Sequence, residues 1–73
     1  MNLAQFNKEY DPNKKCYVKY RDANGWIHLG LLLQGVSTAL NGNKFVYVNS
    51  FTNRVSLDRL ISLSVSMETW YQQ

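Results

Sequence analysis

Few side chains in this sequence have the chemistry for catalysis, and they are scattered. A nucleophile needs a base within hydrogen-bond reach and a third group that orients the base. His28 is the only histidine and the only candidate base near neutral pH, and its alternation with Ile27 and Leu29 predicts an outward-facing surface position. No two of the five carboxylates stand at a spacing that would pair them. The sequence therefore predicts no catalytic residue, and we expect the protein not to be an enzyme.

Metal and cofactor chemistry finds equally little support in the sequence. Cys16 is the only cysteine, so with a single histidine the chain lacks both a set of metal ligands and an internal disulfide. We expect no metal and no cofactor. Small secreted domains are usually stabilised by disulfides or bound metal ions. The sequence also shows neither a signal peptide nor an apolar run that could span a bilayer. Composition therefore favours a cytoplasmic protein that does not contact a membrane.

Aromatic and cationic side chains have a more informative spacing. They interleave along two neighbouring stretches, 17–21 and 26–28, in a chain of net charge +3. Bases stack on aromatic rings at about 1–3 kcal/mol each, and cations follow the phosphates of a single strand. The candidate binding residues are Tyr17, Lys19, Arg21, Trp26, His28, Tyr47, Arg54, Arg59 and Trp70. The pattern also fits a plainer interpretation, in which Tyr17 and Trp26 form a cross-strand pair that stabilises a hairpin.

The first element that must position these residues is a short N-terminal helix or arm, residues 1–11. Asn2 is a suitable N-cap, and Leu3, Phe6 and Tyr10 recur on one helical face. The residue before a proline is driven away from helical dihedral angles, so we expect the helix to end before Pro12.

Strands joined by tight turns are predicted from residue 15 onward. Residues 16–21 alternate in hydropathy, and the Asn-Gly pair at 24–25 predicts a type I′ hairpin turn with positive φ at both positions. The return strand is long, and we expect it to bend at Gly30 and Gly35. A second Asn-Gly pair, at 41–42, predicts a turn into the next strand, KFVYVNSF.

The stretch RVSLDRLISLSVS, residues 54–66, shows two periods in succession. SLDRL is too short for a full α-helix and predicts a single 3₁₀ turn with Ser56 as its cap. From Ile61 onward apolar residues alternate with serine, which predicts a final strand.

This alternation assigns a face to each strand residue. The residues expected to face inward are Val18, Tyr20, Ile27, Leu29, Leu31, Val46, Val48, Leu63 and Val65. The opposite face would then collect Tyr17, Lys19, Arg21, Trp26, His28, Phe45 and Tyr47.

The order of three hairpin-linked strands, a short fourth strand, a 3₁₀ turn and a fifth strand resembles the SH3-like small barrel, and the leading helix resembles the Sm-like variant. LGLL at 29–32 loosely matches the first Sm-like signature. The Arg-Gly pair of the second signature is absent, since Asn53 and Arg54 stand there, and DANG is too short for the long acidic loop of a peptide-binding SH3 domain. The resemblance implies an all-β, five-stranded barrel over residues 15–67, within one domain of residues 1–73 that ends in a tail, 68–73.

Two binding functions follow as expectations. The first is a protein-interaction module, including an inhibitor of a host or cellular factor encoded by a phage or mobile element, with Trp70 as an interface anchor or as a lid on the barrel. The alternative is binding of single-stranded nucleic acid through the basic and aromatic face. A homo-oligomer could also form through the last strand, ISLSVS, because it carries no charge to discourage edge pairing.

Overall fold

The computed structural model describes residues 1–65, so Trp70 and the predicted tail, 68–73, lie outside the described residues. Among residues 1–65 no helix is long and apolar enough to cross a membrane. The elements are α1 (Leu3–Glu9), β1 (Cys16–Arg21), β2 (Ile27–Leu32), β3 (Ser37–Thr38), β4 (Lys44–Tyr47), β5 (Arg54–Ser56), the 3₁₀ helix η1 (Leu57–Arg59) and β6 (Leu60–Ser64).

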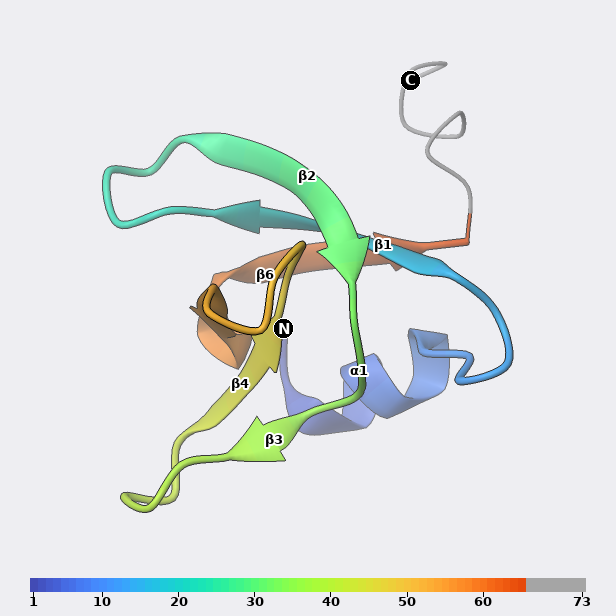
Figure 1. The fold of residues 1–73 in the computed structure, drawn as a ribbon, viewed down its shortest axis with the longest axis horizontal. Coiled ribbons are helices and arrows are strands. Elements are labelled where there is room, and N and C mark those ends of the chain that lie inside the picture. The colour runs from blue at the N-terminus through green and yellow to red at the C-terminus, as the bar shows by residue number, and fades with distance from the viewer. Residues whose placement is uncertain (66–73) are drawn as a thin grey trace.

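The strands of residues 1–65 form two antiparallel three-stranded sheets, ordered β2-β1-β6 and β3-β4-β5. The prediction of a mainly β domain with a short leading helix and a 3₁₀ turn before the last strand is confirmed. The prediction of a five-stranded barrel is not. The long second strand is divided into β2 and β3 by residues 33–36, which include Gly35, and the two sheets do not close into a barrel. Figure 1 shows β2 curving across β1 before the chain descends to β3.

Helix α1 begins and ends where the sequence predicts. The side chain of Asn2 accepts a hydrogen bond of 2.8 Å from the backbone N–H of Gln5, which satisfies one of the open donors of the first turn. Phe6 is buried, and its ring centroid lies 5.2 Å from that of Tyr10. The α-amino group of Met1 donates to the carbonyl of Leu60 at 3.1 Å, which ties the N-terminus to the start of β6.

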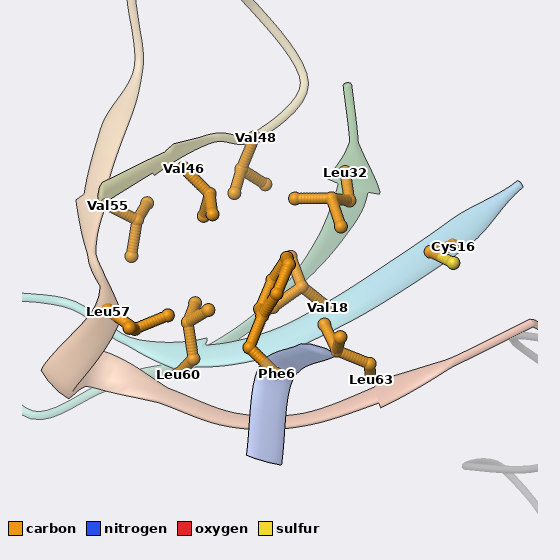
Figure 2. Packing of buried hydrophobic residues seen from close by; sticks show 10 residues of the cluster. All are labelled: Phe6, Cys16, Val18, Leu32, Val46, Val48, Val55, Leu57, Leu60 and Leu63. Carbon is orange, nitrogen blue, oxygen red and sulfur yellow. The ribbon is translucent and has the colours of Figure 1, made fainter. Parts of the chain in front are cut away.

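One apolar cluster fills the space between α1 and the two sheets. Its buried members are Phe6, Cys16, Val18, Leu32, Val46, Val48, Val55, Leu57, Leu60 and Leu63. Phe6 lies in the middle of this cluster, facing Val46 and Val48, whereas Cys16 lies at its margin (Figure 2). Full burial of one such side chain stabilises the fold by roughly 1.5–3 kcal/mol. The helix therefore contributes to the core chiefly through one ring.

The first hairpin turn differs from the predicted type I′ turn. Of the Asn24-Gly25 pair only Gly25 has a positive φ, 86°. The N–H of Gly25 donates to the carbonyl of Asp22, and one carboxylate oxygen of Asp22 accepts from the N–H groups of Asn24 and Trp26. These bonds define a turn over 22–25 with a bulge at the glycine, a longer connection than a two-residue loop.

The longer turn moves the register of the hairpin by one residue. Tyr20 lies opposite His28, whereas a two-residue turn at 24–25 would oppose Arg21 and His28. Because side chains alternate between faces, a slip of one residue turns every side chain of β2 to the other face. The predicted inward positions of Ile27, Leu29 and Leu31 are therefore wrong. The core side of β2 is occupied by Leu32 and Gly30, which lie opposite Cys16 and Val18, and His28 shares that side.

The last strand also departs from simple alternation. Tyr20 pairs with Leu60 and Lys19 pairs with Ser62, so Ile61 is an extra residue at a bulge. Leu60 and Leu63 are buried, as predicted for Leu63, while Ile61 is exposed at the bulge. Val65 follows the end of β6 and is exposed, so its predicted inward position is wrong.

The two sheets meet where the end of β2 lies against the chain that follows β4. A bridge joins Leu32 to Val48, and the N–H of Asn49 donates to the carbonyl of Leu31 at 2.8 Å. The side-chain oxygen of Asn49 accepts from the N–H of Leu31, also at 2.8 Å. Val48 approaches Gly30 so closely that a Cβ at Gly30 would overlap its side chain. Position 30 must be glycine because this contact leaves no room for a Cβ atom; the backbone angle φ does not impose the requirement.

We expect Gly30→Ala to lower the free energy of unfolding by about 1–3 kcal/mol, the usual cost of overpacking. Urea denaturation measures the change. Gly35→Ala is the matched control, because a Cβ there would lie 3.4 Å from a ring carbon of Tyr10, an ordinary contact. Equal midpoints for the two variants would show that β2 does not depend on this close approach.

Candidate functional site

The predicted basic and aromatic face is divided by the fold. Tyr17, Lys19 and Arg21 share the outer face of β1, and the register places Leu31, Leu29 and Ile27 opposite them. We call these six residues the hairpin face. Its cations therefore lie beside aliphatic side chains, not beside Trp26 and His28 as the sequence predicted.

The remaining residues of the predicted set occupy separate positions. Trp26 lies at the end of the first hairpin with 71% of its surface exposed. The guanidinium of Arg21 donates to the carbonyl of Gly25 at 2.9 Å, so it is held against the turn. Arg59 is exposed on η1. Among the described residues of the predicted set, Tyr47 and Arg54 lie opposite each other, paired across the neighbouring strands β4 and β5.

His28 belongs to a small polar cluster beside the turn of the first hairpin. Its ring stacks on Tyr20, with centroids 5.4 Å apart, and Nε2 lies 2.7 Å from Oδ2 of Asp22. A carboxylate only accepts, so the ring N–H is the donor. This hydrogen bond is the main reason that the pKa of Asp22 is lowered, and the N–H groups of Trp26 and Asn24 act in the same direction. The cluster holds the turn, and within residues 1–65 no three Cys, His, Asp or Glu side chains gather as metal ligands.

A pocket of about 600 Å³ opens on the outer side of the second sheet. Its lining residues, which we call the pocket face, are Ser37, Thr38, Ala39, Leu40, Asn41, Phe45, Tyr47 and Arg54. They come from β3, β4, β5 and the turn between β3 and β4, a hairpin that projects from the rest of the fold (Figure 1). The register places Phe45 and Tyr47 on the face of β4 opposite Val46, which belongs to the buried cluster.

Three aromatic rings and one guanidinium form a contiguous cluster at this pocket, and two of the rings, Phe45 and Tyr47, line it. The guanidinium of Arg54 lies 4.7 Å from the ring centroid of Phe45 and 5.8 Å from that of Tyr47. Tyr47 meets Phe45 edge to face at 5.3 Å and meets Phe51 at the same centroid distance. A cation over a ring face is attracted by about 0.5–1 kcal/mol at exposed sites. Phe45 points outward as predicted, yet only 9% of it is exposed.

The charge of Arg54 is not balanced within the part of the chain that the structure describes. It is the only charged residue among those that line the pocket, and no carboxylate of residues 1–65 forms an ion pair with it. Two large apolar side chains are open to solvent here, Leu40 in the lining and Phe51 against the ring of Tyr47. Leu40 is fully exposed and Phe51 is 62% exposed.

Leu40 and Phe51 are the residues that sequence analysis missed. Both are large apolar side chains within turns, Leu40 directly before Asn41-Gly42 and Phe51 in the turn before β5. Turns normally carry polar residues, so an apolar residue at such a position was the signal available in the sequence.

The Asp22–His28 contact leads to a pH-dependent prediction. The pKa of Asp22 is lower in the folded than in the unfolded chain, so its contribution to stability is present above the unfolded pKa and is lost as pH falls through the folded pKa. We expect His28→Gln to raise the pKa of Asp22 toward its ordinary value, measured by ¹³C NMR of the carboxyl carbon. Trp26→Ala retains the backbone donor and should leave the pKa low. The same pKa with and without His28 would contradict the assigned cause.

Comparison with known proteins adds no assignment to this geometry. No family model, no curated protein and no solved structure matches the chain. The site is therefore interpreted from its own side chains.

Proposed function

We propose that the protein is a non-enzymatic binding module that docks a protein partner on the pocket face. The observation that carries the proposal is the open pocket whose walls combine stacked aromatic rings, an exposed leucine and one unbalanced arginine. Aromatic and arginine side chains dominate the energetics of protein interfaces. Aromatic side chains do so in part because they bury a large area around few rotatable bonds. Held by mutual stacking, Tyr47 and Arg54 lose little conformational entropy when a partner binds.

Finer aspects of the proposal concern the fold and the biological setting. The sheet orders β2-β1-β6 and β3-β4-β5, with η1 leading into β6, support an SH3-like small barrel as the fold to which this domain is related. The free, buried thiol of Cys16 supports a cytoplasmic location. Inhibition of a host or cellular factor, by a protein of phage or mobile-element origin, is the form of this function that its small size favours.

The alternative, binding of single-stranded nucleic acid, has less support. It needs cations that follow the phosphates and rings that are free to stack on bases. Lys19 and Arg21 lie beside aliphatic side chains, and Arg21 is bonded to the turn. On the pocket face the ring of Phe45 is already covered by a guanidinium.

A selection of random peptides displayed on phage tests the proposal. We expect peptides to be enriched that bind the wild-type protein with an affinity reduced about 10-fold or more by Tyr47→Ala, the typical effect at an interface hot spot. Leu40→Ser provides a second variant, because a fully exposed side chain can be changed without loss of core packing. Isothermal calorimetry measures both affinities.

Trp26→Ala is the matched control for that selection, since it removes an equally large exposed side chain from the other hairpin. It should leave the affinity unchanged. Peptides that lose binding with Trp26→Ala but keep it with both pocket variants would overturn the proposal. So would salt-dependent amide shifts at residues 37–47 with a mixed-sequence oligonucleotide in the absence of any selected peptide, because such shifts indicate phosphate contacts.

A further inference from the structure

We infer that the segment bound on the pocket face carries a carboxylate, which pairs with Arg54, next to a large apolar side chain. This inference rests on the proposed function and names the chemistry of the partner: an extended protein segment with aspartate or glutamate beside leucine or an aromatic residue. The argument comes from the way in which Arg54 is held.

The stacking of Arg54 leaves its hydrogen-bonding edge unused. A guanidinium is planar, and it contacts rings through its face while its five N–H donors lie in its plane. With 4.7 Å between Arg54 and the ring of Phe45, the face is occupied. No hydrogen bond and no ion pair joins the guanidinium of Arg54 to any residue in the range 1–65. A carboxylate can accept two parallel hydrogen bonds from the N–H groups of a guanidinium, and these charged hydrogen bonds are stronger than hydrogen bonds between neutral groups.

Other cations near the hairpins are engaged differently. Lys44, the first residue of β4, donates from Nζ to the hydroxyl of Thr38 at 2.8 Å. Arg21 donates to a backbone carbonyl of its own turn. A nucleic acid strand needs a row of cations to neutralise successive phosphates, whereas the pocket lining supplies one. A single buried carboxylate per bound segment fits this charge better.

The apolar part of the ligand follows from the surroundings of Arg54. Phe51 and Leu40 are both exposed, and Phe51 continues the ring cluster through Tyr47. Exposed apolar side chains beside a cation would cover an aliphatic or aromatic group adjacent to the carboxylate, which removes water from the ion pair and strengthens it. Phenylacetate is a small ligand with both features, and phenylacetamide is its neutral counterpart of nearly the same shape.

The test is a titration of the ¹⁵N-labelled full-length protein with each of these two compounds, followed by amide shifts. We expect phenylacetate to shift amides of residues 37–41, 45–47 and 54 with a dissociation constant in the millimolar range, and phenylacetamide to bind about fivefold more weakly. Arg54→Gln should abolish the difference between the two compounds, and Arg54→Lys should retain part of it. Arg54 is exposed and does not belong to the buried apolar cluster, so we expect both variants to fold.

The outcomes separate this inference from the proposal on which it rests. Equal affinity for the two compounds, with shifts at the pocket, would overturn the carboxylate inference and leave peptide docking intact. Shifts spread equally over Lys19 and Arg59 would also overturn it, because they indicate unspecific ion pairing. Inorganic phosphate that binds the same amides more tightly than phenylacetate would overturn it in favour of a phosphate ligand. Absence of shifts with both compounds, while selected peptides still bind at Tyr47, would refute the inference alone.

Discussion

The contact between Gly30 and the chain at Val48–Asn49 is the constraint on which the rest of the structure depends. At this point the two sheets share backbone and side-chain hydrogen bonds, with Asn49 serving Leu31 both as donor and as acceptor. Asn49 adopts a positive φ of 67°, which asparagine tolerates better than most residues. The turn that follows brings β5 back beside β4. This turn places Tyr47 opposite Arg54.

A second constraint, the turn at Asp22, governs the other half of the molecule. The carboxylate of Asp22 accepts two backbone donors and the ring of His28, which favours the longer turn over a two-residue loop. The resulting register directs Ile27, Leu29 and Leu31 outward. The first hairpin consequently presents an aliphatic surface, and the concentration of aromatic and cationic groups lies on the second sheet instead.

Local signals in the sequence were enough to predict several elements. The cap at Asn2 and the proline at 12 bound α1, and the alternation of Val46 and Val48 correctly marks the core side of β4. The 3₁₀ turn was predictable because the segment SLDRL is too short for an α-helix. The inward position of Leu63 in β6 was also predicted correctly. The face of β2 was not predictable in the same way, because it depends on a single extra residue in the turn. Such a residue leaves the hydropathy pattern of the strand unchanged but turns its side chains to the opposite face of the sheet.

The candidate site was predictable only as separate residues. Tyr47 and Arg54 were selected for their chemistry, but their meeting depends on pairing between strands and on the turn at 49–53, which periodicity does not reveal. Leu40 and Phe51 were overlooked because apolar residues within turns carry no periodic signal. Trp70 lies outside the described residues and stays a prediction.

The most direct test of the account is the location of a selected peptide on the protein, measured by isotope-filtered nuclear Overhauser contacts. The account predicts contacts from apolar protons of the peptide to the rings of Tyr47 and Phe51 and to the methyl groups of Leu40, with the peptide carboxylate next to Arg54. Contacts to Tyr17, Leu29 and Leu31 on the hairpin face, with none at Tyr47, would contradict it.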